Sequence, residues 1–362
     1  HIEYDVLHKA ATRLMRHGAE MNQRAEYFVC FGTAGLYCRQ WAIAGEAIYG
    51  DQGFLSLFDD GFSEDGNGLE GGNYHRATVM SMCRFAEQLH DQGVSLYTPR
   101  FKRVFDASVM TTPRGVAEYC QASYEQAYRI YRNPDYLPTL RQLRKSFNAQ
   151  SVLDGVPGIP DGPEALSATS VLDASGYLFL RRNTPAGHRC LAINFGMQWD
   201  RTELDRLHTR FFVDGKRIDR QIGRITYGSP FAGNMYRSFA HNLVTVDGMD
   251  MTEQRVPIAG QHGADTLTAA LFMTREDAPL YPGVRQWRLV AIAGEHFIVL
   301  DHLESATPRQ YAWHYYAESK AQQVSLPLEA MVTSPAMAAR REVNGSVGPC
   351  RRGMTDKALV AS

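Results

Sequence analysis

Tyr74 and His75 stand side by side in the run Glu70-Gly71-Gly72-Asn73-Tyr74-His75. A phenol and an imidazole can each give or take a proton, so this pair is suited to acid–base catalysis. The run lies where a predicted helix opens from a loop, a usual place for catalytic groups on a helical scaffold. The alternative is structural, with Tyr74 packed beneath the loop and His75 merely starting the helix.

The segment before this run, residues 59–69, is rich in acidic residues and glycines. That composition is unsuited to a helix interior and indicates a long loop. Loops of this length inside a compact domain are usually functional or disordered. We therefore expect the loop to help position Tyr74.

Composition limits the classes of function. The chain has 362 residues, enough for two domains, and 38 Lys+Arg against 39 Asp+Glu give a net charge of -1. Without a basic block, no nucleic-acid partner is expected. No stretch approaches the roughly 20 apolar residues of a membrane span. No signal peptide is visible, so we expect that a leader has been removed or that the start is missing.

The first part of the chain is predicted to be helical, because apolar residues recur there at intervals of three and four. The Asn133-Pro134 step marks a break between the last two helices. Long helices with broad apolar faces suggest a toroid of helical hairpins over residues 1–150. The expected helices cover residues 5–19, 26–49, 74–90, 116–131 and 136–147.

The rest of the chain is predicted to be an antiparallel β-sandwich. Residues 151–168 are a linker by their glycines and prolines, and beyond them the apolar period changes to two. The sandwich is expected over residues 169–350, followed by a poorly packed tail at 351–362. The expected strands lie at 177–182, 191–195, 209–213, 243–246, 267–272, 286–290 and 296–300.

This order of features resembles the heparinase II/III-like polysaccharide lyases. The resemblance rests on the Glu70–His75 run and on Ala240-His241-Asn242-Leu243-Val244-Thr245-Val246-Asp247-Gly248, and it extends from about residue 20 to about residue 320. It implies a fold of the α+β multidomain class, with an (α/α) toroid followed by an antiparallel β-sandwich. The helical part is shorter than a full toroid, so the toroid is expected to be incomplete.

The resemblance assigns roles to single residues. These lyases carry an Asn or His some fifty residues before the catalytic tyrosine, where it neutralises the carboxylate of a uronic acid. Asn22 occupies that place, and Tyr74 matches the tyrosine. His241 matches a sandwich histidine that binds a metal, usually zinc, in many members.

The chain departs from the family pattern at the metal site. Arg201 and Glu203 stand where a catalytic and a metal-binding histidine are usual, and Gln221 stands where a ligand aspartate is usual, whereas Asp205 is retained. Glu203, Gln221 and His241 would form an oxygen-rich set. The expected cofactor is therefore a divalent metal, either zinc or a harder cation such as calcium or manganese. No organic cofactor is expected. The alternative is an Arg201–Glu203 salt bridge and no metal.

The implied reaction is β-elimination on a 4-linked uronic acid. It requires removal of the C5 proton, stabilisation of the negative charge that builds up on the carboxylate, and protonation of the leaving O4 oxygen. Asn22, helped by the cation of Arg201, can hydrogen-bond the carboxylate. Tyr74 can protonate the leaving oxygen and, when deprotonated, can also take the C5 proton. His75 and His208 are candidate replacement bases, and each also has a structural alternative.

Four further residues are predicted to bind substrate. Gln23 adjoins Asn22, and aromatic rings such as those of Trp199 and Tyr236 can stack on sugars, although most aromatic residues belong to cores. Glu70 is the fourth, with bracing of the Tyr74 loop as its alternative role.

The sequence thus predicts a lyase that cleaves a uronic-acid-containing acidic polysaccharide, such as a glycosaminoglycan or alginate. A periplasmic or secreted location follows from the resemblance. The alternative of another class is a non-catalytic carbohydrate-binding protein that kept the scaffold after losing the usual His base and metal ligands. A weaker reading is a glycoside hydrolase that uses paired acids such as Asp59, Asp60 or Glu64.

Overall fold

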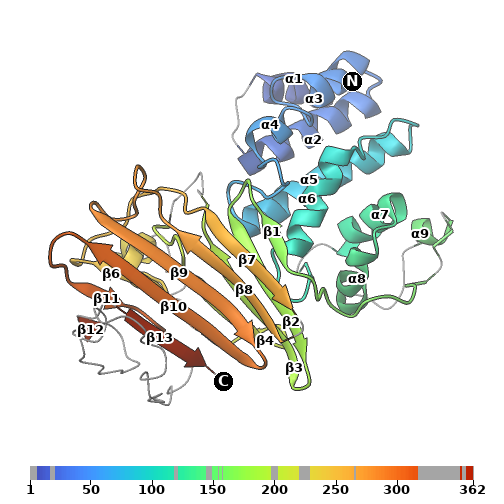
Figure 1. The fold of residues 1–362 in the computed structure, drawn as a ribbon. Coiled ribbons are helices and arrows are strands. Elements are labelled where there is room, and N and C mark those ends of the chain that lie inside the picture. Colours follow the sequence, from blue (N-terminus) through green and yellow to red (C-terminus); the bar gives the residue numbers. More distant parts are fainter. Residues whose placement is uncertain are drawn as a thin grey trace. The chain divides into compact units, whose positions relative to one another are not determined.

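The chain folds into two compact units, one helical and one built of antiparallel sheets (Figure 1). Among the described residues, the first unit runs up to Leu166 and includes Leu172–Ser175, and the second contains Ser167–Val171 and everything from Gly176 onward. The computed structural model describes residues 6–16, 21–117, 121–143, 149–153, 155–156, 158–196, 203–219, 229–264, 266–316, 351–352 and 356–361.

The helical unit is organised around its longest helix, α5, which runs from Gly72 to His90. Its apolar residues at intervals of three and four, among them Val79, Met82 and Phe85, are buried in one core with α2 and α6. No helix in the described part of the chain combines the length and apolar character that crossing a bilayer requires. The helices are α1 (Lys9–Met15), α2 (Met21–Tyr37), α3 (Trp41–Tyr49), α4 (Leu57–Asp60), α5 (Gly72–His90), α6 (Pro99–Met110), α7 (Gln121–Tyr131), η2 (Pro134–Tyr136), α8 (Leu137–Leu143) and α9 (Ala149–Leu153).

Two features of this unit differ from the sequence prediction. The single helix expected over residues 26–49 is two helices, because the chain turns at Arg39, whose φ of 55° lies in the left-handed region. Helix α6 was not predicted, although the Thr98-Pro99 step is typical of the start of a helix. Thr98 caps the helix by accepting a hydrogen bond from the backbone N–H of Phe101, and proline is favoured in the first turn.

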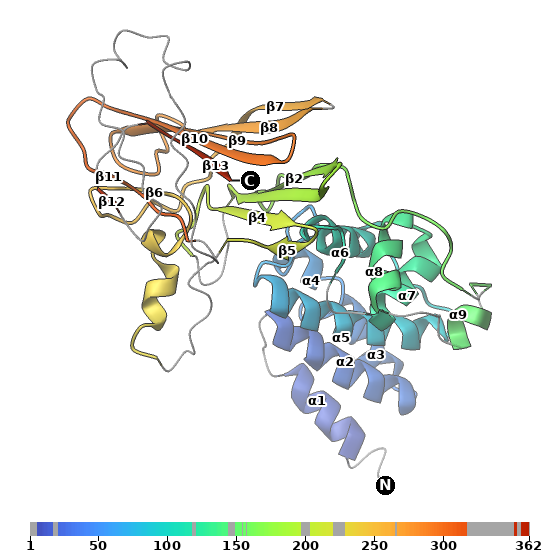
Figure 2. The same cartoon turned by 90° about the horizontal axis from the view of Figure 1, so that it is seen from below.

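The second unit is an antiparallel sandwich. Two five-stranded sheets, in the orders β1-β2-β3-β4-β5 and β13-β10-β9-β8-β7, form separate layers in Figure 2, and a smaller sheet has the order β12-β11-β6. The strands are β1 (Ser170–Leu172), β2 (Tyr177–Thr184), β3 (Gly187–Asn194), β4 (Thr209–Val213), β5 (Lys216–Arg217), β6 (Val244–Val246), β7 (Ile258–Ala264), β8 (Leu267–Met273), β9 (Val284–Ala293), β10 (His296–Ser305), β11 (Tyr311–Trp313), β12 (Arg351–Arg352) and β13 (Asp356–Ala361).

The sandwich core lies between the facing sheets. Alternate residues of β3 and β10, such as Leu191, Ile193, Phe297 and Val299, are buried in one cluster, as the period of two predicted. The fold class expected from the sequence, helices followed by an antiparallel sandwich, is confirmed. The tail expected at 351–362 is corrected in part, because Asp356–Ala361 pairs with β10 as an antiparallel strand.

Candidate active site

The acidic segment before α5 begins in the last turn of α4, where Asp59 and Asp60 each form an ion pair. Arg24 of α2, which is buried, donates two hydrogen bonds to the carboxylate of Asp60, one of them at 2.8 Å. Arg100 of α6 donates to Asp59 Oδ1 at 2.7 Å. Two of the three acids of the hydrolase alternative, Asp59 and Asp60, are therefore each engaged with an arginine.

The same loop is shaped by close backbone contacts. Gly66 has φ +88°, and a Cβ there would lie 2.3 Å from the backbone of Arg103, so only glycine fits. The carboxylate of Asp65 accepts hydrogen bonds from the backbone N–H and the hydroxyl of Ser175, at 2.9 and 3.1 Å. These contacts fix the path of the chain towards Tyr74.

Tyr74 lies in the first turn of α5. The helix begins after Gly71, whose φ of 85° ends the loop in a conformation that favours glycine. The side chain of Tyr74 is partly buried, and its carbonyl oxygen accepts a hydrogen bond from Thr78 Oγ1 at 3.0 Å. Tyr74 is thus carried by a helix and is partly exposed as a residue, which suits a group that must meet a substrate.

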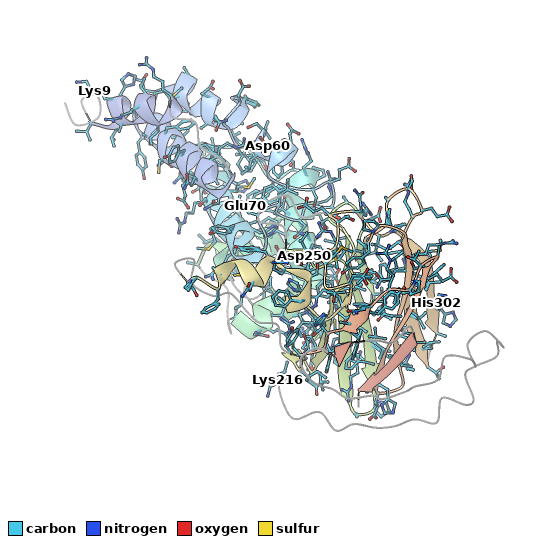
Figure 3. The ribbon with its side chains drawn as sticks, turned by 90° about the vertical axis from the view of Figure 1, so that its left-hand side faces the viewer. Lys9, Asp60, Glu70, Lys216, Asp250 and His302 are labelled. Carbon is cyan, nitrogen blue, oxygen red and sulfur yellow. The ribbon has the colours of Figure 1, made fainter. Side chains whose placement is uncertain are left out.

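Asn22 contacts the segment that carries Tyr74. Its backbone N–H, in the first turn of α2, donates to Glu70 Oε2 at 2.8 Å. When its side-chain amide nitrogen faces Glu70, that nitrogen donates to Oε2 at 3.1 Å and to Oε1 at 3.2 Å. Glu70, labelled in Figure 3, precedes Tyr74 by four residues. The structure therefore brings the two principal predicted residues to one region of the helical unit.

His75 faces the interior. Its Nδ1 accepts a hydrogen bond from the backbone N–H of Gly68 at 2.8 Å, and its Nε2 lies 2.6 Å from Ser108 Oγ. The ring also packs edge-on against Phe62, at 5.6 Å between centroids. Burial lowers the pKa of His75 from 6.5 to about 4, against an opposing effect of the Val104 backbone. With both nitrogens engaged and a neutral ring, this geometry favours the structural role over that of a base.

His75 should make the helical unit sensitive to acid. Because its folded pKa is depressed, the neutral ring stabilises the fold fully above pH 6.5, and this contribution is lost as the pH falls from 6.5 towards 4. Between pH 7 and 4.5 the loss amounts to about 2 kcal/mol. Urea unfolding of wild type and His75→Gln should therefore show a steeper loss of unfolding free energy in the wild type. Parallel pH dependence of the two proteins would contradict this.

In the sandwich unit, Glu203, Asp205 and His241 place one potential ligand atom each within 4.8 Å of one another. Asp205 and His241 are buried, and Glu203 is partly buried. His241 Nε2 lies 4.0 Å from Glu203 Oε2, beyond hydrogen-bonding distance. Asp205 Oδ1 accepts from Asn194 Nδ2 at 2.7 Å, which orients the carboxylate. Sequence reasoning missed Asp205 as a potential ligand, although its spacing of two from Glu203 was visible.

These donors fit a divalent cation. Two carboxylates and one imidazole form an oxygen-rich set that suits calcium or manganese as well as zinc. Burial lowers the pKa of His241, against an opposing effect of Asp205, so that the ring is neutral as a metal ligand must be. Asn194 supplies the outer hydrogen bond that metal-ligating carboxylates usually have.

His208 lies deep in the sandwich unit. It is 2% exposed, and its Nδ1 accepts a hydrogen bond from the backbone N–H of Asn242 at 2.9 Å. Burial, followed by the charge of His241 and nearby arginines, holds its pKa well below 6.5. Its ring lies 5.3 Å from that of His241. This placement favours a structural role for His208.

The remaining predicted site residues lie in different parts of the chain. Trp199, Arg201 and Gln221 lie outside the described residues. Gln23 is exposed on α2, next to Asn22. Tyr236 ends the 3₁₀ helix η3 (Ala232–Tyr236) in the sandwich unit, is partly buried, and accepts a hydrogen bond from the Leu204 N–H through its carbonyl.

Comparisons with known proteins connect this arrangement to a known fold. No model of a known protein family matches the sequence, and no curated protein matches it either. Heparan sulfate lyase HepC from Pedobacter heparinus matches with a TM-score of 0.61 and 13% identity, over 86% of this chain and 50% of that one. The chain has the fold of the heparinase III lyases. A structure described as heparinase III matches with a TM-score of 0.64 and 12% identity, over 88% of this chain and 53% of that one.

The heparinase III fold agrees with the resemblance predicted from the sequence. Another heparinase III gene product matches with a TM-score of 0.63 and 15% identity, over 88% of this chain and 51% of that one. The chain therefore spans about half the length of the solved structures that it matches. At these identities the likeness establishes the fold alone.

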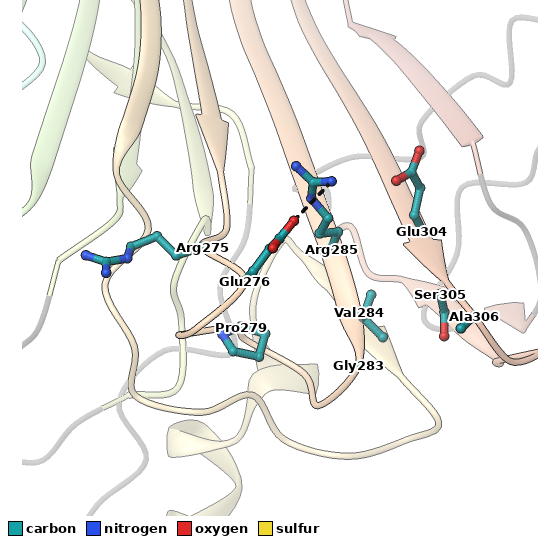
Figure 4. A pocket seen from close by; sticks show the side chains of 9 residues that line it. All are labelled: Arg275, Glu276, Pro279, Gly283, Val284, Arg285, Glu304, Ser305 and Ala306. Carbon is teal, nitrogen blue, oxygen red and sulfur yellow. Dashed lines mark ion pairs between the residues drawn. The ribbon is translucent and has the colours of Figure 1, made fainter.

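A separate groove of about 470 Å³ lies on the sandwich unit, beside the loop that precedes β9 (Figure 4). Arg285 and Glu276 point towards one another across it, 3.4 Å apart, while Arg275 points away and donates to Asp277 at 2.9 Å. Arg285 and Glu276 are thus paired with one another, whereas Arg275 and Glu304 are paired with Asp277 and His302, which lie outside the groove. No predicted site residue lines the groove.

Proposed function

We propose that this chain catalyses β-elimination on an acidic polysaccharide that contains uronic acid. Two observations support the proposal. The fold is that of heparan sulfate lyases, and Glu70 holds Asn22 against the segment that carries Tyr74. The second observation carries the assignment of residues, because an amide and a phenol are the two groups that the reaction needs together. The substrate is an extracellular polymer, so we also propose a periplasmic or secreted location.

In this mechanism Tyr74 acts as both base and acid. Its phenolate takes the C5 proton of the uronic acid, the C4–O bond breaks as the C4–C5 double bond forms, and the phenol then returns the proton to the departing O4. Asn22 donates a hydrogen bond to the uronate carboxylate, where negative charge builds up in the transition state. The single-tyrosine route follows from the engagement of both His75 nitrogens and from the burial of His208.

The test is a panel of uronate polymers followed in the ultraviolet. Heparan sulfate comes first, and chondroitin, hyaluronan, alginate and ulvan-type polymers follow, since all present the same C5 chemistry. A rise in absorbance from the unsaturated uronate, with a new reducing end for each double bond, is expected for at least one polymer. Chain cleavage without a double bond would replace the proposal with hydrolysis, and no cleavage of any polymer would refute it.

We further propose that Glu203, Asp205 and His241 hold a divalent cation. When bound, the cation would supply positive charge that offsets the two carboxylates. Calorimetry of the metal-stripped protein should show a higher melting temperature on addition of calcium, manganese or zinc. At 100 times the dissociation constant the gain is about 2.7 kcal/mol.

The Glu203→Gln variant tests the assignment of the ligands. It should lose most of this gain, whereas Glu253→Gln, elsewhere in the sandwich unit, should keep it. Identical melting of the stripped wild type with and without every metal would rule the site out.

A further inference from the structure

We propose that Glu70 is the positioning residue that sets the orientation of the Asn22 amide for catalysis. This inference rests on the proposed function. It assigns Glu70 a role through Asn22, in place of the direct contact with substrate that the sequence predicted.

The first step of the argument is the geometry of the contact. The carboxylate of Glu70 receives the backbone N–H of Asn22 at 2.8 Å. When the side-chain amide is turned so that its nitrogen faces Glu70, that nitrogen also donates to the two oxygens, at 3.1 and 3.2 Å. The two residues are 48 positions apart in the chain. The backbone N–H belongs to the first turn of α2, where N–H groups have no partner within the helix. Glu70 therefore holds the main chain of Asn22 and, in this orientation of the amide, its side chain as well.

The second step concerns the direction in which the amide points. An amide can present either its acceptor oxygen or its donor nitrogen to a ligand, and the two differ by a half-turn of the side chain. An acidic acceptor such as Glu70 selects the nitrogen. The amide nitrogen carries two N–H groups, so one can bond the carboxylate of Glu70 while the second donates to the uronate in the proposed reaction.

The third step is that the position of Glu70 is itself constrained. It lies four residues before Tyr74, between Gly68, which contacts the buried His75 ring, and the α5 cap at Gly71. The cavity beside it, lined also by Thr78, measures only about 10 Å³, about the limit for a single water. On the side of this cavity the Glu70 side chain therefore has little room to move away from Asn22.

The experiment is a double-mutant cycle on the full chain with Glu70→Gln, Asn22→Ala and the double variant, read by both kcat/KM and melting temperature. Glutamine keeps the shape of Glu70 but can offer its own N–H to Asn22, so the amide is no longer oriented. We expect Glu70→Gln to lower kcat/KM about 10- to 100-fold. Added to Asn22→Ala, it should lower kcat/KM by less than about threefold further. Glu164→Gln, an exposed glutamate of the same unit, is the matched control and should stay at the wild-type rate.

Each outcome decides a different point. If the losses in kcat/KM multiply in the double variant while those in melting temperature do not, Glu70 braces the fold without orienting Asn22, and the inference is wrong. If both kinds of loss are independent, the contact itself has no effect, and the inference is again wrong. A wild type without lyase activity on any polymer refutes the proposed function, whereas an active wild type with an unaffected Glu70→Gln refutes only the positioning role.

Discussion

Tyr74→Phe should abolish lyase activity while leaving the fold intact. The substitution removes only the hydroxyl, and in the proposed mechanism that one oxygen both takes the C5 proton and returns it to O4. Loss of a single general acid or base costs about 10²- to 10⁴-fold, so loss of both roles should reduce kcat to the upper end of that range or below detection. The measurement is the initial rate of unsaturated-uronate formation on the best polymer of the panel.

Tyr49→Phe is the matched control, because Tyr49 ends α3 and its side chain is 74% exposed. It should retain the wild-type rate and melt within about 2 °C of the wild type, since surface substitutions usually cost less than about 0.5 kcal/mol. Tyr74→Phe removes one partly buried hydroxyl, which costs about 0.5 to 1.5 kcal/mol at most, so this variant should also stay folded at the assay temperature. A Tyr74→Phe protein with full activity would remove the phenol from the mechanism. In that case the neutral His75 and the buried His208 would have to be reconsidered as bases.

The sequence predicted those elements whose apolar period is uninterrupted. Helix α5 and the strands β2, β3 and β8 to β10 follow this rule, because one face of each is buried in a single core. The turn between α2 and α3 was missed for the opposite reason. Apolar residues continue on both sides of the turn, and the break depends on the left-handed backbone conformation of one residue, Arg39. Arginine is not a residue type whose presence predicts that conformation.

The candidate site was predictable only in part, because spacing along the chain gives types of residue and not their contacts. The resemblance identified Asn22 and Tyr74, but nothing in the sequence shows that Glu70 receives the amide of a residue 48 positions away. His75 illustrates the converse. Its neighbour Tyr74 suggested chemistry, whereas the structure turns the imidazole towards Gly68 and Ser108, as expected for consecutive helical residues that diverge by about 100°.

Removal of one partner of a buried ion pair in the sandwich should strongly destabilise that unit. Arg288 of β9 is fully buried and donates to Asp301 of β10 through Nε at 2.6 Å and a second guanidinium nitrogen at 2.7 Å. It also donates to the carbonyl oxygens of Leu207 and Asn242, the latter at 3.1 Å. Those two residues adjoin His208 and His241, so Arg288 links the strands to the segments of the candidate metal site.

Arg288→Ala should therefore destabilise the sandwich unit by about 3 to 5 kcal/mol, because it leaves the carboxylate of Asp301 buried without its partner. For a unit of this size the melting temperature should fall by roughly 10 °C in calorimetry. Arg285→Ala, an exposed position on the same strand, controls for the loss of an arginine and should change the unfolding free energy by less than about 0.5 kcal/mol. The double replacement Arg288→Met with Asp301→Leu separates the two possible causes. If an unpaired charge is what destabilises the single variant, the apolar pair should recover much of the lost stability, whereas an equally unstable double variant would place the cost in the carbonyl groups of Leu207 and Asn242.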